Sequence, residues 1–355
     1  MEPGDHNRKR GHAVDLPDVH LLSSGTALPG APISNVELAE RFGGDTLFAE
    51  WADTFVGTRN RHFSVDLATA EVRFRLADLG RIAAEKALEG AGLAASDVDV
   101  IVMGTSSPDQ LMPATVNVIA DQLGINDVPT YQLQSGCTGA VQALDVAQQA
   151  LQTGRHRTAL VIGGDTCTKH LDLDLDPSKL SPSELVPGLM FGDGAGAAVL
   201  STTPTDGSAV LRKVLVRLTG LGRKPGHVVE WYGPADLADP PPSVGEDYKA
   251  IEESVPTMAV EILEEMLDDL DWKDVDYLLP PQLSGKMTDL IVKRLALPDA
   301  QEVSVVAETA NTGNALPFFQ LERLLPRLTD QDRAVAIAVE SSKWIKGGLA
   351  LEKVS

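Results

Sequence analysis

The stretch RIAAEKALEGAGLAASDVDVIVMGTSS, residues 81–107, combines an amphipathic helix, an Asp-Val-Asp entry and an apolar strand that ends in small polar residues. The same order returns in EILEEMLDDLDWKDVDYLLPPQ, residues 261–282. A further strand motif in residues 155–165, RHRTALVIGGD, is echoed by DQDRAVAIAVESS in residues 330–342. Apolar strands that alternate with amphipathic helices are typical of buried sheets covered by helices. The sequence therefore predicts an α/β fold built from two similar halves.

The chain divides into three predicted parts. Residues 1–17 form a leader with a basic cluster but no apolar run, so they resemble neither a signal peptide nor a membrane anchor, and we expect them to be flexible. Residues 18–203 and 204–355 are the two α/β halves. At about residues 232–248, prolines and glycines break any period and predict an insertion loop at the start of the second half.

Composition restricts the class of protein. A hydrophobic content of 43% with 23% charged residues is ordinary for a folded protein. The formal charge of -21 argues against a nucleic-acid partner, because phosphate binding needs a basic surface. Two cysteines in 355 residues argue against a disulfide framework, and the sequence has no apolar segment long enough to span a bilayer. We expect a cytoplasmic protein without membrane contact.

Cys137 is the candidate nucleophile. In YQLQSGCTGAVQALDVAQQ, residues 131–149, it stands between a short strand and the head of a long helix. The helix dipole and the free N–H groups of the first turn predict a thiol pKa below the ordinary value of about 8.5. Small neighbours such as Gly136 leave room for a substrate. A buried structural cysteine is the alternative, and it is the favoured interpretation for Cys167, which no clear helix head follows.

Several motifs together resemble the ketoacyl-ACP synthase III family of the thiolase superfamily. From about Leu21 to the C-terminus they come in that family's order: WADTFVGTRNRHF (51–63), GTSSPDQLMPATV (104–116), QSGCTGAVQAL (134–144) and FGDGAGAAVL (191–200). The resemblance implies a thiolase fold, which is a duplicated five-layer αβαβα architecture, usually in a homodimer. It also implies a cysteine that accepts an acyl group from acyl-ACP, a phosphopantetheine thioester, or from acyl-coenzyme A, with no bound cofactor and no metal.

The resemblance further implies a histidine and an asparagine beside the cysteine. The family's histidine motif corresponds to LLPPQLSGK, residues 278–286, in which Pro281 stands at the position of the histidine. The asparagine corresponds to Asn311 in ETANTGNALP. The glycine-rich C-terminal turn of the family corresponds to the region of Ser342. We therefore expect Gly136 and Ser342 to support an oxyanion with backbone groups.

A proline in place of the histidine changes the predicted chemistry. An acyl-cysteine needs a thiolate and N–H donors, which the backbone can supply, whereas decarboxylation of a malonyl extender needs two donors on the enolate oxygen. Loss of one such donor typically costs ~10²–10³ in rate, and the proline side chain has no donor. Efficient decarboxylative condensation is therefore disfavoured. Replacement by another histidine stays open, with solvent or loop roles favoured for each candidate: His62, His156, His170 and His227.

The family recognises coenzyme A with a tryptophan and nearby arginines. Trp51 matches the tryptophan, but Phe55 stands four residues later, and residues 171–188 form an acidic loop. The case for a free coenzyme A donor is thereby weakened. Met112 is a further candidate for the substrate region, and the length of the acyl pocket depends on the facing of residues such as Met112, Leu111 and Met190.

Basic residues on the helix predicted after Pro281 favour a carrier protein instead. Lys286, Lys293 and Arg294 fall on one helical face and match positions at which the family presents cations to an acyl carrier protein. Because carrier proteins are acidic, a basic face on a chain of charge -21 indicates docking. A solvated helix surface of mixed charge is the alternative.

These observations lead to one main hypothesis and two alternatives. The chain is predicted to be an acyltransferase in which Cys137 takes an acyl group from an acyl carrier protein. It would pass that group, without decarboxylation, to a small-molecule or carrier-bound acceptor in polyketide or other natural-product biosynthesis. One alternative is a starter-unit ketosynthase that performs decarboxylative condensation. The other is a non-catalytic subunit that pairs with an active homologue.

Overall fold

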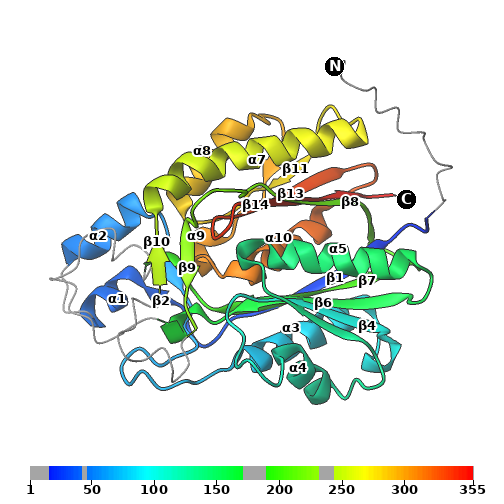
Figure 1. Cartoon of the computed structure of the whole chain (residues 1–355), viewed down its shortest axis with the longest axis horizontal. Coiled ribbons are helices and arrows are strands. Elements are labelled where there is room, and N and C mark those ends of the chain that lie inside the picture. The colour runs from blue at the N-terminus through cyan, green and yellow to red at the C-terminus, as the bar shows by residue number, and fades with distance from the viewer. Residues whose placement is uncertain (1–15, 42–45, 171–188, 232–243, 355) are drawn as a thin grey trace.

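A computed structural model describes residues 16–41, 46–170, 189–231 and 244–354 of the chain (Figure 1). The strands of the first half are β1 (His20–Ala27), β4 (Val100–Gly104), β5 (Thr130–Leu133), β6 (Thr158–Asp165) and β7 (Gly194–Ser201). They lie in the order β1-β7-β6-β4-β5. The pairs β4–β5 and β4–β6 are parallel, whereas β6–β7 and β1–β7 are antiparallel.

The second half repeats this arrangement. Its strands β8 (Ala209–Leu218), β11 (Tyr277–Leu279), β12 (Gln301–Glu302), β13 (Arg333–Glu340) and β14 (Ile345–Glu352) lie in the order β8-β14-β13-β11-β12, with the same parallel and antiparallel pairs. A short antiparallel contact between β1 and β8 joins both sets into one ten-stranded sheet. The two Asp-Val-Asp strands of the sequence, β4 and β11, occupy equivalent positions.

Helices alternate with the two sheet halves in five layers, which Figure 1 shows from bottom to top. Helices α3 (Leu76–Ala91) and α4 (Thr115–Leu123) cover the outside of the first half, and α7 (Tyr248–Leu270) and α8 (Gly285–Leu295) cover the second. Between the halves lie α5 (Gly139–Gln152) and α10 (Leu316–Leu324). The expected α/β thiolase architecture is confirmed.

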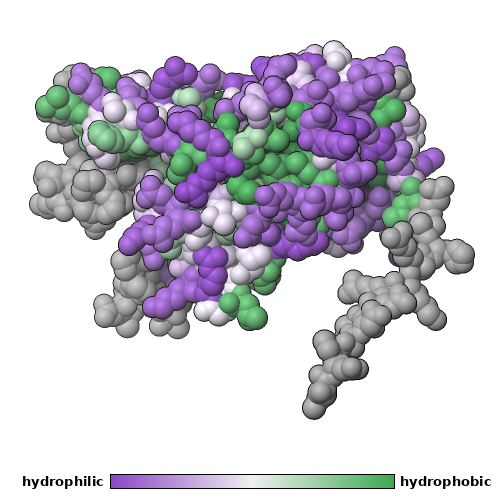
Figure 2. All heavy atoms as spheres, turned by 90° about the horizontal axis from the view of Figure 1, so that it is seen from above, coloured by the Kyte–Doolittle hydropathy of each residue, from purple (hydrophilic) through white to green (hydrophobic). Residues whose placement is uncertain are grey.

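Strand alternation explains the layering. Val100 and Val102 of β4 pack in the central core with α5, whereas Ile101 and Met103 of the same strand pack in the core under α3 and α4. Successive side chains of a strand point to opposite faces, so a strand that is apolar at every position must be covered on both. The outer helices present polar residues to water, and Figure 2 shows hydrophilic residues over much of the α7/α8 side with a band of apolar residues between them.

The remaining elements frame the ends of the strands. They are β2 (Ile33–Ser34), α1 (Asn35–Arg41), α2 (Thr46–Phe55), β3 (Asn60–Arg61), β9 (His227–Val229), β10 (Val244–Glu246) and α9 (Val306–Thr309), with short 3₁₀ turns between them. Most of the predicted leader, residues 1–15, and most of the predicted insertion loop, residues 232–243, lie outside the described residues. The proposed limits of the two halves stay a prediction.

Candidate active site

Cys137 lies in a 3₁₀ turn, Gly136–Thr138, between β5 and α5. Its side chain keeps some exposed surface although protein surrounds it. Gly136 before it has φ +54°, a left-handed conformation that favours glycine. A Cβ on Gly136 would also come within 1.8 Å of Glu340 Oε2, so this position has no space for a side chain.

The structure brings three predicted residues to one pocket. Cys137, Pro281 and Asn311 all line it, although they come from the β5–α5 turn, the exit of β11 and the segment after α9. Pro281 is buried and presents an apolar ring with no hydrogen-bond donor. The pocket therefore contains the thiol and the amide that the sequence predicts, with a proline at the third position.

Asn311 is held firmly at the pocket wall. It is 3% exposed, and its Oδ1 accepts the N–H of Gly313 at 3.0 Å. Its backbone N–H donates to Met190 O at 2.8 Å, and its carbonyl accepts the N–H of Gly192 at 3.1 Å. With Oδ1 engaged by Gly313, the Nδ2 group is the donor that the amide can offer to a ligand.

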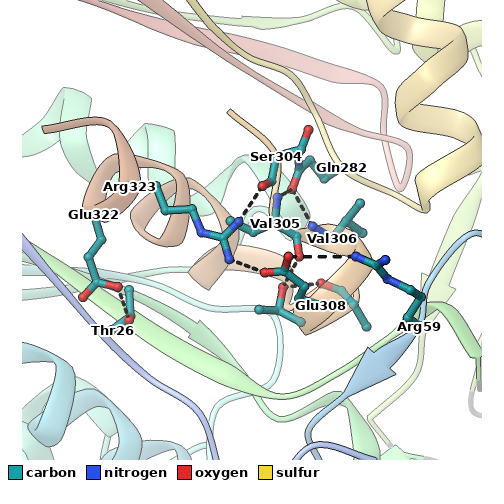
Figure 3. A network of polar contacts seen from close by, with 11 residues as sticks. Thr26, Arg59, Gln282, Ser304, Val305, Val306, Glu308, Glu322 and Arg323 are labelled. Atoms are coloured by element: carbon teal, nitrogen blue, oxygen red, sulfur yellow. Dashed lines mark hydrogen bonds and ion pairs between the residues drawn. The ribbon is translucent and has the colours of Figure 1, made fainter. Parts of the chain in front are cut away.

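A polar network holds the segment that leads to Asn311 (Figure 3). Gln282 Oε1 accepts the N–H groups of Val305 and Val306 at 2.9 and 3.0 Å, which ties the exit of β11 to the start of α9. From α10, Arg323 donates to Ser304 O at 2.9 Å and forms an ion pair with Glu308. These contacts fix the relative positions of Pro281 and Asn311.

Glu340, which ends β13, is a site residue that was not predicted from the sequence. Its side chain is 3% exposed. Oε2 accepts the N–H of Cys137, and Oε1 accepts the N–H of Ser342 at 2.5 Å. The carboxylate thus occupies two backbone donors at the site, one of them the group predicted for Ser342. The signal in the sequence is the acidic residue directly after the apolar strand AVAIAV. Burial of a carboxylate at such a strand end is costly unless polar groups pair with it, so this position indicates partners.

The predicted low pKa of Cys137 is wrong. Burial raises the pKa of the thiol well above its ordinary value, and the charges of Glu340 and Asp165 add to the effect. The expectation assumed free N–H groups at the helix head. Glu340 instead takes the N–H of Cys137, and the Oδ1 of Asn314 takes the N–H of Ala140 at 2.8 Å, so neither donor is left for a thiolate.

A second pocket meets the first at Cys137 and Asn311. Its wall includes Glu246 and Tyr248 from the β10–α7 region. Behind that wall, His227 Nδ1 lies 2.7 Å from Glu246 Oε1. Burial by itself lowers the pKa of His227, but the contact with Glu246 and the charge of Glu340 raise it above its ordinary value. His227 is thus the candidate histidine that comes near the site, in contact with a wall residue.

The other candidate histidines lie elsewhere. His62 is buried, with Nδ1 3.2 Å from Pro29 O. His170 ends the 3₁₀ turn Cys167–His170, and His156 lies in the connection between α5 and β6. None of the three lines the two pockets at Cys137.

The predicted substrate residues are not in contact with these pockets. Trp51 and Phe55 contact each other on α2 with their rings tilted by 32° and the ring centroids 5.9 Å apart, and Phe55 is 64% exposed. Met112 is 87% exposed. None of the three lines either pocket at Cys137, so their roles stay predictions. The acidic loop predicted at 171–188 lies outside the described residues.

Helix α8 presents the predicted docking cations. Lys286, Lys293 and Arg294 are all exposed, and none of them forms an ion pair within the described part of the chain. The helix starts four residues after Pro281, so its cations lie close to the pocket along the chain. Over the same described residues, no cluster of three or more His, Cys, Asp or Glu side chains could hold a metal, and no helix could cross a bilayer.

Comparisons with known proteins cover both halves of the chain. Residues 131–217 match the family model for 3-oxoacyl-[acyl-carrier-protein] synthase III, and residues 267–341 match its C-terminal counterpart. A beta-ketoacyl-[acyl-carrier-protein] synthase III from Sphingopyxis alaskensis is 34% identical over 83% of this chain and 86% of its own.

Two solved structures extend the likeness to nearly the whole chain. One, described as AbyA1, a tetronic acid condensing enzyme, is 54% identical with a TM-score of 0.91, over 94% of this chain and 99% of its own. The other, the priming beta-ketosynthase of the R1128 polyketide pathway, is 25% identical with a TM-score of 0.81, over 98% of this chain and 99% of its own. The chain belongs to the 3-oxoacyl-[acyl-carrier-protein] synthase III family.

Proposed function

We propose that this protein is a condensing acyltransferase that takes an acyl group from an acyl carrier protein onto Cys137 and transfers it to an acceptor without decarboxylation. One observation carries the proposal. Cys137 and Asn311 line a common pocket in which the decarboxylating histidine is replaced by Pro281. The site keeps the group needed to form an acyl-enzyme and lacks one of the two donors that stabilise the enolate left by loss of carbon dioxide.

The likeness to AbyA1 suggests the kind of product. A tetronic acid contains a five-membered lactone ring with an enol oxygen. Assembly of that ring from two thioesters requires one carbon–carbon bond and one ester bond, with no loss of carbon dioxide. The carbon nucleophile can be the acidic carbon between the two carbonyls of a 3-oxoacyl thioester. We therefore infer that the acceptor is a 3-oxoacyl thioester and that the transferred acyl group carries a hydroxyl.

The charges on helix α8 indicate the acyl donor and, through it, the compartment. The cations Lys286, Lys293 and Arg294 are exposed and form no ion pair with the residues that the structure describes, which favours an acidic carrier protein over free coenzyme A. A carrier-bound substrate in turn favours a cytoplasmic enzyme. Asn311 would orient the acyl carbonyl or the acceptor through its Nδ2 group.

Intact-mass spectrometry tests the proposal. The protein and its Cys137→Ala variant are incubated with hydroxyacyl and simple acyl carrier proteins and with the matching coenzyme A thioesters. A 3-oxoacyl thioester is then added. We expect an acyl mass shift that the variant lacks, a condensed product on addition of the acceptor, and no carbon dioxide from malonyl carrier protein.

The alternatives give different results. Release of carbon dioxide from malonyl carrier protein, together with acylation of Cys137, would support the starter-unit ketosynthase. No mass shift with any donor would contradict both enzymatic functions and support a non-catalytic subunit. A mass shift without condensation on a 3-oxoacyl thioester would support acyl transfer by Cys137 and contradict the inferred tetronic acid product.

A further inference from the structure

Glu340 occupies the place where an acyl-enzyme needs an oxyanion hole. The N–H groups of Cys137 and Ser342 both donate to its carboxylate. Two converging backbone donors beside a nucleophile are the usual arrangement for stabilising the oxyanion of acyl transfer. The negative oxygen of a tetrahedral intermediate cannot share these donors with a carboxylate. Acyl transfer at Cys137 therefore requires the Glu340 side chain to leave.

The surroundings of Glu340 show what could make it leave. The N–H of Cys137 donates to the carboxylate, and the negative charge of Glu340 lies close enough to the thiol to raise its pKa. Among the described residues, Asp165 and Cys167 are the other titratable groups whose charges raise the pKa of the thiol. The charge of Glu340 in turn raises the pKa of His227. A carboxylate accepts charge-assisted hydrogen bonds about twice as strong as neutral ones. Protonation would weaken its hold on both N–H groups.

We propose that Glu340 is the general base for Cys137 and that its carboxylate closes the oxyanion hole until it has accepted the thiol proton. The proposal rests on the proposed function, because it requires Cys137 to accept an acyl group. Glu340 would thus supply a proton acceptor that neither Pro281 nor Asn311 can provide.

The proposed step moves one proton and exchanges one thioester for another. The Cys137 proton passes to the Glu340 carboxylate while Sγ attacks the thioester carbonyl carbon. The neutral Glu340 side chain leaves the two N–H groups, which then bind the oxyanion. The intermediate collapses by breaking the bond to the carrier's pantetheine sulfur, and this sulfur accepts from Glu340 the proton that came from Cys137. A new thioester on Cys137 and a free pantetheine thiol result.

Two measurements on Glu340→Gln test the proposal. The first is the pH profile of Cys137 alkylation by iodoacetamide, which requires thiolate but no base and no oxyanion hole. The second is the single-turnover rate of acylation by the preferred acyl carrier protein. The glutamine removes a negative charge beside the thiol, so the alkylation profile should move to lower pH. Acylation at neutral pH should nevertheless fall by ~10²-fold or more, because the base is missing.

The control is Glu352→Gln, which removes a carboxylate at the far end of neighbouring strand β14, where Glu352 pairs with Arg212 and Arg333. It should leave both rates unchanged. A second variant, Glu340→Ala, should be acylated slowly and recover part of its rate when formate is added as an external base. Circular dichroism and thermal midpoints check that the variants fold.

Three results would overturn the general-base role. Acylation of Glu340→Gln at the wild-type rate would show directly that Glu340 is not the general base. A parallel fall of alkylation and acylation in a folded variant would indicate a purely structural glutamate. Acylation that appears only once Glu340 is removed would identify a permanent plug in a non-catalytic subunit. Failure of the proposed function is distinguishable, because wild type and Cys137→Ala would then be equally unreactive toward every donor.

Discussion

Pro281 is the residue on which the proposed absence of decarboxylation depends. It lies buried in the pocket with Cys137 and Asn311, where a donor would complete the pair needed for an enolate. A carbon between two carbonyls can form a carbanion by losing a proton instead of carbon dioxide. Because its charge is spread over both carbonyl oxygens, this carbanion depends less on the pair of hydrogen-bond donors. The substitution therefore fits an enzyme whose nucleophile is formed by deprotonation.

Restoring the donor should restore decarboxylation in part. We expect Pro281→His to release carbon dioxide from malonyl carrier protein at least ~10-fold faster than wild type, which is a fraction of the ~10²–10³ that one donor contributes. Pro281→Ala is the matched control, since it removes the ring without adding a donor and should not gain the activity. Equal rates for both variants would show that the missing histidine does not limit decarboxylation.

At the scale of elements, α8 links the pocket to the surface. Its N-cap Ser284 accepts the N–H of Met287 at 3.2 Å, so the helix starts at a defined position just after the exit of β11. Met287 and Ile291 anchor its inner face in the core with α7. The outer face is left with the exposed cations Lys286, Lys293 and Arg294.

Reversal of these charges should weaken carrier docking. We expect Lys286→Glu, Lys293→Glu and Arg294→Glu combined to raise KM for acyl carrier protein ~10-fold or more at low salt, with less effect at high salt because ions screen exposed charges. Alkylation of Cys137 by iodoacetamide should not change. Lys273→Glu, at an exposed lysine in the turn after α7, is the control. An unchanged KM in the triple variant would place the docking surface elsewhere.

At the scale of the whole molecule, the central layer holds the two halves together. Phe318 of α10 is fully buried in the cluster that includes residues of both half-sheets. It packs against the strands so closely that a Cβ on Gly196 or Gly163 would come within 2.3 or 2.5 Å of its atoms. These glycines provide the space for the aromatic ring.

Loss of this ring should destabilise the fold. We expect Phe318→Ala to lower the free energy of unfolding by about 3–5 kcal/mol, as a buried aromatic leaves a cavity. Leu221→Ala, at a side chain that is 98% exposed, should change it by less than about 0.5 kcal/mol. Urea denaturation measures both. A loss below about 1 kcal/mol for Phe318→Ala would mean that the central layer repacks.

The homodimer expected from the family stays a prediction. Strand β5 ends the ten-stranded sheet, and its Tyr131 is 48% exposed. An unpaired edge strand is a ready surface for pairing with a second copy. Light scattering should give twice the 37.7 kDa of the chain. Tyr131→Lys, which places a charge on this edge, should shift the protein toward monomer, and an unchanged mass would exclude β5 as the interface.

The sequence by itself determined the layers of the fold and the position of the nucleophile in a turn between a strand and a helix. Continuous apolar strands such as β4 required cover on both faces, and the repeat of helix, Asp-Val-Asp and strand predicted that β4 and β11 would be equivalent. The Gly136–Cys137 turn and the alignment of Pro281 and Asn311 with family motifs indicated the members of the pocket. These features are local in the chain, so periodicity and short motifs can reveal them.

Only the tertiary structure decided the state of the nucleophile. Glu340 is 203 residues from Cys137 along the chain, yet it accepts that residue's N–H. The direction of the thiol pKa and the approach of His227 to the site depend on the same packing. A pKa is set by the groups that surround an atom in space, and no local pattern records which distant strand end brings a carboxylate there.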